Sequence, residues 1–463
     1  MNRWVALGAV ALGTFMTYLD NNVVNVALPS IQRDLDLSIS GLEWIVSSYI
    51  LVFAGLLMAG GRLADVFGVR NTFLGGLAIF TAASALAGIA GSPELLIGAR
   101  AVQGVGAALL APAALSAIAA LFTEPAERAK AIGLWGGTGA LALALGPLIG
   151  GVLSEHASWG WIFLINVPFG VVTAVLAVRH LPADSGSRRP VDVPGLLASS
   201  VGLFALTFGL IEGDGHGWGS ALIIGSFAVA AVAAALFVLV ELRSADPMID
   251  LRLFRKVSFS GGLLITGLWA FGVFGIYFFL TLYLQNVLGF SPTEAGAAFV
   301  PLALVMAVMA AVSDQLVKRI GAAVTVAVGM GLMGLSVGWI STIGADGGYL
   351  DLLAPFLVYG MGAGMLIPLT DVIISGVPAS ESGIASGMLN VSREVFGLLG
   401  VTVLGAILSA RQTDQTPAAF LDAYQFTLVV AGVIVALAVP LALATLRRRQ
   451  VAESVPEPEP VAV

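Results

Sequence analysis

Long apolar runs separated by short polar segments occupy nearly the whole chain. A helix that crosses the hydrocarbon core of a bilayer needs about 20 mostly apolar residues, so each run predicts one membrane-spanning helix. About fourteen such runs begin near Val5, Leu42, Thr72, Glu94, Ala129, Gly160, Pro194, Gly219, Ser258, Thr293, Gly321, Leu350, Ser382 and Leu421. The pattern therefore predicts an all-α integral membrane protein.

The basic residues predict the orientation of these spans. An even number of spans puts both termini on one side, and arginine and lysine concentrate in cytoplasmic loops. Cytoplasmic termini place most of the 21 basic residues on the cytoplasmic side, whereas only Arg33 and Arg411 fall on the outer side. We therefore expect a multi-pass protein of the cell (inner or plasma) membrane with both termini in the cytoplasm.

Composition narrows the possible functions. The chain is 58% hydrophobic and 11% charged, which is typical of an integral membrane protein and not of a soluble enzyme. It has no cysteine, its three histidines lack metal-site spacing, and no lysine follows a glycine as in a phosphate-binding Walker A loop. The net charge of -7 gives no sign of a nucleic-acid partner. We expect no enzyme activity, no metal, and no cofactor beyond a proton gradient.

A weak internal repeat divides the chain into two halves. Asp65 and Arg70 follow the second span, and Asp314 and Arg319 follow the tenth span at the same spacing. The repeat predicts two six-helix bundles with two extra central spans, an arrangement that places a substrate between the bundles near the midplane. The expected boundaries are 1–181 for the first bundle, 182–257 for the extra spans, 258–449 for the second bundle and 450–463 for a disordered cytoplasmic tail.

Three charged residues, Asp20, Arg100 and Glu394, fall inside apolar spans, where an ionised side chain is costly and usually functional. At helical rise, Arg100 lies about 9 Å inside its span and Asp20 lies at about 12 Å from the same membrane face. The two would meet if the first and fourth spans are neighbours. Two alternatives are that Arg100 reaches the headgroups and that Glu394 forms a structural salt bridge with another span.

Glu394 is the second deep carboxylate, and Arg393 precedes it directly. Successive side chains on a helix point about 100° apart, so Arg393 need not neutralise Glu394. Each deep carboxyl would take up a proton from outside and release it to the cytoplasm. A substrate that arrives from the cytoplasm would compete for the deprotonated carboxylate, which gives exchange without ATP.

Polar and aromatic residues inside the spans are candidates for a substrate cavity. The asparagines that follow Asp20 share one helix face at spacings of three and four, and aromatic rings bind flat apolar cations. Aromatic belts at the membrane interface are the alternative explanation for most of the aromatic residues. The predicted cavity residues are Asn21, Asn22, Asn25, Gln103, Trp135, Trp269 and Tyr277.

Two glycine-containing segments predict close helix contacts. The short turn after the second span carries a carboxylate beside basic residues, which either latches helix ends in one state or is an ordinary cytoplasmic loop. The fifth span carries a face of small residues that ends in a bend. Close helix packing and hinge bending both require such residues, so the pattern does not distinguish the two roles. The turn contains Gly61, Asp65, Gly68 and Arg70, and the fifth span contains Gly146, Pro147, Gly150 and Gly151.

Taken together, these motifs resemble the major facilitator superfamily, and specifically its fourteen-span drug:proton antiporter family. The resemblance covers nearly the whole chain, and so many motifs in one order are highly specific. They are residues 19–29, the turn at Asp65, and residues 100–104, 146–151, 159–168, 192–195, 217–218 and 283–292. The resemblance implies that Asp20 couples protons, that Arg100 modulates proton transfer, that the Asp65 turn forms a cytoplasmic gate, and that Gly146 and Pro147 form the antiporter hinge.

The resemblance also implies a function, namely a proton-coupled antiporter that exports lipophilic, cationic drugs or antibiotics from the cytoplasm by alternating access. Glu394 stands where the family more often has glutamine, and this extra acid would favour cationic substrates. The expected partners are a small-molecule substrate, protons and the lipid bilayer, and we expect a monomer. The alternatives are a dedicated exporter of one endogenous metabolite and a nontransporting membrane receptor with this fold, which the deep charges argue against.

Overall fold

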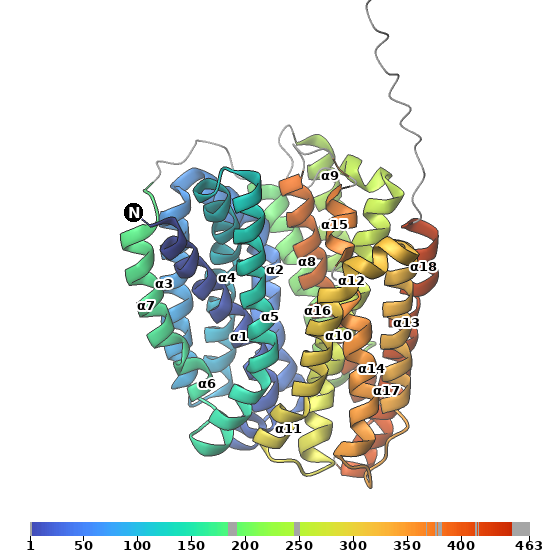
Figure 1. Cartoon of the computed structure of the whole chain (residues 1–463). Coiled ribbons are helices and arrows are strands. Elements are labelled where there is room, and N and C mark those ends of the chain that lie inside the picture. Colours follow the sequence, from blue (N-terminus) through green and yellow to red (C-terminus); the bar gives the residue numbers. More distant parts are fainter. Residues whose placement is uncertain are drawn as a thin grey trace, which may run out of the picture.

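The computed structural model describes residues 2–183, 192–244, 251–366, 368–375, 377, 382–412, 414 and 416–446. Every secondary-structure element within these residues is a helix, and Figure 1 shows the long helices side by side along one direction. The fold class predicted from the sequence is therefore confirmed. The expected tail, residues 450–463, lies outside the described residues.

The first seven helices form one bundle, coloured blue to green in Figure 1. Within it α1 packs on α5 and α7, while α4 packs between α2 and α3. The two short helices α6 and α7 together make one apolar stretch. These helices are α1 (Arg3–Leu35), α2 (Ile39–Phe67), α3 (Val69–Gly88), α4 (Pro93–Leu121), α5 (Pro125–His156), α6 (Trp161–Leu164) and α7 (Asn166–His180).

The last nine helices form a second bundle, in which α10 packs on α16 and α14 packs on α12 and α13. They are α10 (Val257–Asn286), α11 (Pro292–Ala298), α12 (Val300–Ile320), α13 (Ala322–Ile340), α14 (Tyr349–Gly364), α15 (Pro368–Ser375), α16 (Ser382–Arg411), α17 (Pro417–Ala436) and α18 (Ala438–Thr445). Between the bundles in sequence come α8 (Val193–His216), α9 (Ala221–Arg243) and the short helix η1 (Leu251–Arg255). Because α8 packs on both α2 and α16, the first extra helix contacts both bundles.

Thirteen helical stretches among the described residues are long and apolar enough to cross a membrane. Helix α1 is not among them, although it has 33 residues, because the polar residues around Asp20 make it less apolar. Counting α1, the described helices match the number of spans expected from the sequence. Large apolar side chains also cover the outside, as Val308 and Leu335 show with 63% of each residue exposed. Such a surface suits lipid.

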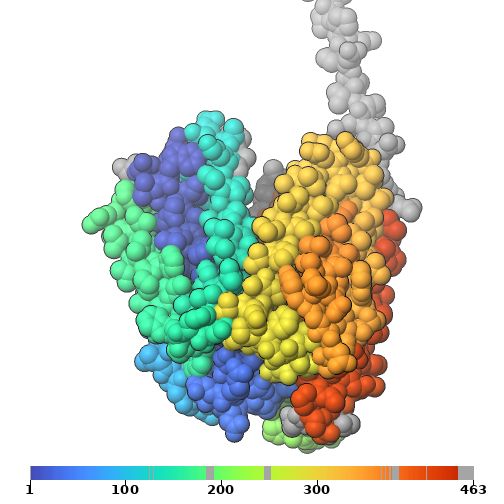
Figure 2. Space-filling model, turned by 60° about the horizontal axis from the view of Figure 1, so that its bottom comes forward, coloured from blue at the N-terminus to red at the C-terminus, as the bar shows by residue number. Residues whose placement is uncertain are grey.

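The two bundles meet at the end of the molecule that lies away from the termini. There an added Cβ on Gly151 of α5 would overlap the carbonyl of Pro292 in α11. Gln285 of α10 donates to the Val26 carbonyl of α1 at 2.8 Å. Figure 2 shows a notch between the bundles near the opposite end, where α1 begins and α18 ends. We call these the far end and the terminal end; the notch opens at the terminal end, although Gly387 of α16 still lies against Met58 of α2.

Candidate functional site

Asp20 lies at the centre of a polar cluster inside the first bundle. One carboxylate oxygen pairs with the Arg100 guanidinium of α4. Gln103 and Asn166 donate amide N–H groups to the other oxygen, at 3.0 and 2.8 Å. All four side chains are completely buried. The structure therefore brings the first and fourth spans together, as the meeting of Asp20 and Arg100 requires.

Further contacts hold the Arg100 side chain in place. Its Nε donates to the Ile45 carbonyl of α2 at 3.2 Å, and its Nη1 donates to Gln103 Oε1 at 2.9 Å. The guanidinium carbon lies 4.4 Å from the centre of the Tyr49 ring, within the range of a cation–π contact. Because Arg100 is fully buried and anchored in the bundle, the alternative that it reaches the headgroups is wrong.

The cluster links four helices and depends on the charge of Asp20. Asp20 belongs to α1, Arg100 and Gln103 to α4, and Asn166 to α7, while Gln103 also donates to Ser84 of α3 at 2.7 Å. A buried ion pair holds because each charge compensates the other, and removing one charge leaves the partner uncompensated. Protonation of Asp20 would therefore weaken the packing of α1 against the rest of the bundle.

Glu394 of α16 is almost completely buried, and its negative charge is compensated by Arg393 of the same helix. Its Oε1 accepts bonds from Arg393 Nε at 3.1 Å and from Arg393 Nη2 at 2.9 Å. The prediction that Arg393 need not neutralise Glu394 is wrong, because the long arginine side chain bends back onto the adjacent residue. The salt bridge expected with another span is formed instead between neighbours.

Arg393 also connects the two bundles. Its Nη2 donates to the hydroxyl of Tyr18 in α1 at 3.1 Å, and its guanidinium carbon lies 5.6 Å from the centre of the Tyr18 ring. Tyr18 stands two residues before Asp20 on the same helix. The two pairs are therefore connected through α1, one sealed in the first bundle and the other at the contact between bundles.

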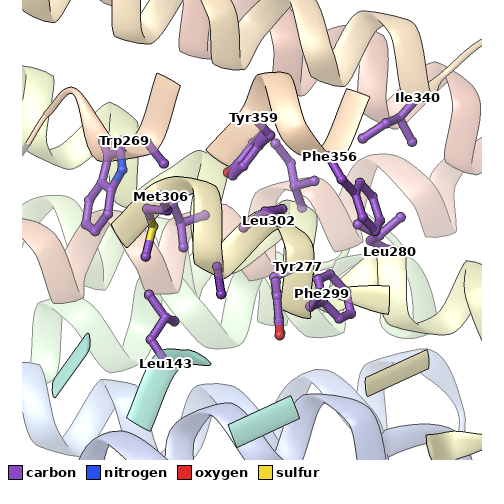
Figure 3. A pocket seen from close by; sticks show the side chains of 14 residues that line it. Leu143, Trp269, Tyr277, Leu280, Phe299, Leu302, Met306, Ile340, Phe356 and Tyr359 are labelled. Atoms are coloured by element: carbon purple, nitrogen blue, oxygen red, sulfur yellow. The ribbon is translucent and has the colours of Figure 1, made fainter. Parts of the chain in front are cut away.

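An apolar cavity lies in the second bundle, beside α5 (Figure 3). Its volume is about 50 Å³, so in the described conformation it is a small cleft and is below the size of a site for a drug-sized molecule. Two predicted cavity residues, Trp269 and Tyr277 of α10, line it, together with Leu143 of α5 and aromatic side chains such as Phe299 and Tyr359. The indole N–H of Trp269 is buried and has no hydrogen-bond partner among the described residues.

The other predicted cavity residues do not line this cavity. Gln103 belongs to the buried cluster around Asp20. Asn22 and Asn25 each donate to a backbone carbonyl one turn earlier in α1, at 2.7 and 3.3 Å, and Asn21 supplies one of these carbonyls. The Trp135 indole donates to a threonine hydroxyl of α1 at 2.8 Å. Contacts of these polar side chains thus stay within α1 or join α1 to its neighbours.

The glycines predicted as a hinge are contact points of α5. At Gly146 and Gly150 an added Cβ would lie 2.6 Å from atoms of α1. Gly151 faces α11 on the other side, and the carbonyl of Pro147 would overlap a Cβ added to Gly296 of α11. These residues therefore lie where α5 packs against its own bundle and against the second bundle at the far end.

The residues predicted as a gate lie on the turn between α2 and α3. Gly68 has a φ of 85°, a left-handed conformation that favours glycine. Arg70 donates to the Val178 carbonyl of α7 at 2.8 Å, and Gly61 lies against α4. The Asp65 carboxylate is exposed and makes no hydrogen bond or ion pair within the described part of the chain. None of these contacts reaches the second bundle.

Sequence reasoning missed a third buried carboxyl, Glu43 of α2, which is 2% exposed. A Cβ added to Gly405 of α16 would overlap it, so Glu43 lies directly on the second bundle. The charge of Glu212 in α8 acts on it, and Glu212 accepts a bond from the Trp44 indole at 2.7 Å. Glu43 stands near the start of a span, where a charged side chain commonly reaches the membrane interface, so nothing in the sequence marks it as buried. Asn166, Ser84 and Tyr18 were also not predicted as site residues.

Comparison with known proteins supports the resemblance. The sequence profile described as Major Facilitator Superfamily matches residues 10–401. The chain is 39% identical over 417 residues to the tetracenomycin C resistance and export protein of Streptomyces glaucescens, covering 89% of this chain and 77% of that protein. It is 39% identical over 428 residues to a cephamycin export protein of Amycolatopsis lactamdurans, covering 90% and 87%.

Among solved structures, the fold is similar to the crystal structure of the peptide transporter POT in complex with sulfate. The TM-score is 0.69 and the alignment covers 95% of each chain, while the sequences are 17% identical. This likeness concerns the fold alone. On the profile match and the sequence relatives, the chain belongs to the major facilitator superfamily.

Proposed function

We propose that this protein is a proton-coupled antiporter that exports lipophilic drugs or antibiotics from the cytoplasm by alternating access. The observation that carries the proposal is the Asp20–Arg100 ion pair, sealed in the first bundle at membrane depth. An ionised carboxylate is costly to bury at this depth, and binding a proton removes its charge. Such a group can therefore couple proton movement to a change in conformation. The relatives named for antibiotic export support the substrate class.

The notch at the terminal end gives the substrate a route of entry. The distribution of basic residues assigns the terminal end to the cytoplasm, so the described conformation receives substrate from inside. Rocking of the two bundles would open the contact of α5 with α11 and release the substrate outside. A proton from outside then neutralises Asp20, weakens the buried cluster and favours return. We infer that the protein works in the cell membrane as a monomer, with the proton gradient as its energy source.

The test is transport by the purified protein in liposomes with an imposed pH gradient, with proton release recorded while candidate compounds are added. Asp20→Asn should fold and insert but lose export driven by the pH gradient. Asp36→Asn is the matched control, because Asp36 is exposed and its left-handed backbone tolerates asparagine. Unimpaired pH-driven export by Asp20→Asn would eliminate Asp20 as the coupling site.

A dedicated exporter of one endogenous metabolite is the second candidate, favoured by relatives whose names specify a single antibiotic. A panel of chemically unrelated compounds separates the two, because a dedicated exporter moves only one class. The liposome assay also tests the alternative of a nontransporting receptor, because a receptor would bind a compound without moving protons.

A further inference from the structure

The ion pair of Arg393 and Glu394 uses only one of the two carboxylate oxygens. Two arginine nitrogens, Nε and Nη2, bond to the same carboxylate oxygen, Oε1. The other oxygen, Oε2, is buried without a hydrogen-bond partner in the described structure. The arginine side chain is 21% exposed and that of Glu394 is 4% exposed, so Arg393 is the member of the pair that an incoming molecule meets.

The deep charges around Tyr18 balance each other. Asp20 is paired with Arg100, and Glu394 is paired with Arg393. Trp269 and the other residues that line the neighbouring cavity carry no charge. Fully ionised, the four charges sum to zero, and a proton on either carboxyl makes the region positive. Neither state offers an unpaired negative charge to a cationic substrate.

We propose that Arg393 determines the charge of the substrate: by neutralising Glu394 it makes the transport site selective for uncharged amphiphiles that carry a hydrogen-bond acceptor. The inference rests on the proposed export function and replaces the expectation of cationic substrates that Glu394 raised. A lipophilic cation would have to lie beside a guanidinium, and like charges at a binding site strongly disfavour association. An uncharged acceptor instead gains the partly exposed donors of Arg393, while its apolar body packs against the apolar side chains around the mouth of the cavity.

Two probes of nearly the same shape test this inference. Triphenylphosphine oxide is uncharged and carries a strong acceptor, whereas methyltriphenylphosphonium is a permanent cation. Their affinities for the purified full-length protein in detergent are measured by calorimetric titration without a pH gradient. The wild-type protein should bind the oxide roughly tenfold or more tightly than the phosphonium, since a repulsive charge contact of a few kcal/mol corresponds to at least that ratio.

Variants of Arg393 and Glu394 test whether the charge of these residues causes the preference for the oxide over the phosphonium. Arg393→Gln removes the guanidinium and leaves Glu394 buried, where it becomes neutral by binding a proton, so this variant should lose the preference for the oxide. Glu394→Gln leaves Arg393 unpaired and should weaken phosphonium binding further while oxide binding is kept. The double variant carries neither charge and should bind the two probes as Arg393→Gln does. Arg393→Lys keeps the charge and should keep the preference of the wild type.

A wild-type protein that does not favour the oxide overturns the inference, whether it prefers the cation or binds neither probe. If Arg393→Gln does not fold, the wild type, Glu394→Gln and Arg393→Lys still decide the question. Because binding is measured without a gradient, its outcome is independent of proton coupling. The proposed function fails separately, when the liposomes show no export driven by a pH gradient.

Discussion

The buried pair of Asp20 and Arg100 should respond unequally to removal of its two partners. Asp20→Asn keeps an amide-accepting oxygen for Gln103 and Asn166 but leaves the Arg100 guanidinium as a buried charge that cannot lose its proton. Arg100→Met leaves Asp20, which becomes neutral by binding a proton. The loss of stability should therefore be larger for Asp20→Asn.

The magnitude follows from the contacts that remain. Removing one partner of a buried ion pair costs about 3 to 5 kcal/mol. In Asp20→Asn the guanidinium keeps the Ile45 carbonyl, the Gln103 oxygen and the Tyr49 ring, so we expect about 3 kcal/mol, the lower end of that range. Arg100→Met should cost about 1 to 2 kcal/mol, close to the loss of hydrogen bonds without a stranded charge.

The assay is unfolding of the purified variants in detergent, followed by intrinsic tryptophan fluorescence during denaturant titration. The double variant Asp20→Asn/Arg100→Met should be more stable than Asp20→Asn alone, because it removes the stranded guanidinium. The reasoning is refuted if Arg100→Met is as destabilising as Asp20→Asn, or if the double variant loses the sum of the two single effects.

Two further predictions concern the packing between helices. Gly150→Ala should weaken the contact of α5 with α1 by about 1 to 3 kcal/mol and slow transport, whereas Gly137→Ala, which has open space around it, should be neutral in the same unfolding and transport assays. Gly405→Ala should displace Glu43 and loosen the far end. Since the chain has no cysteine, a single cysteine introduced at Thr293 should then react faster with a membrane-impermeant thiol reagent; unchanged labelling would contradict the second prediction.

The deep charges were predictable from sequence because the membrane gives them few alternatives. An arginine and an aspartate at similar depth must either pair or reach water, so their depth predicted that Asp20 and Arg100 meet on the condition that the first and fourth spans are neighbours. The same reasoning failed for Glu394 and Arg393, because it used the direction of the Cβ atoms and ignored the length of the side chain. A long arginine bonds to its own neighbour even when the two residues start about 100° apart on the helix.

The polar cavity residues were harder to predict for a different reason. The side-chain amide of an asparagine inside a helix either donates to a backbone carbonyl one turn earlier, as in Asn22 and Asn25, or faces a ligand. Both arrangements have the same sequence pattern. Of the three aromatic residues predicted for the cavity, Trp269 and Tyr277 line it, whereas the indole of Trp135 bonds to α1. The face of a helix that lines a cavity is set by the helices packed around it, and the sequence of one span does not identify those helices.

The two ion pairs differ in a way that separates their proposed tasks. The Asp20–Arg100 pair is fully buried, so a proton reaches it only when the packing of the first bundle changes. The Glu394–Arg393 pair lies at the contact between bundles with Arg393 partly exposed, where we propose that it meets substrate. Tyr18 connects the two pairs, because it belongs to the same helix as Asp20, two residues earlier, and accepts a bond from Arg393. Under these proposals, a shift of α1 on protonation of Asp20 would displace the partner of Arg393 and so couple the proton to the group proposed to select the substrate.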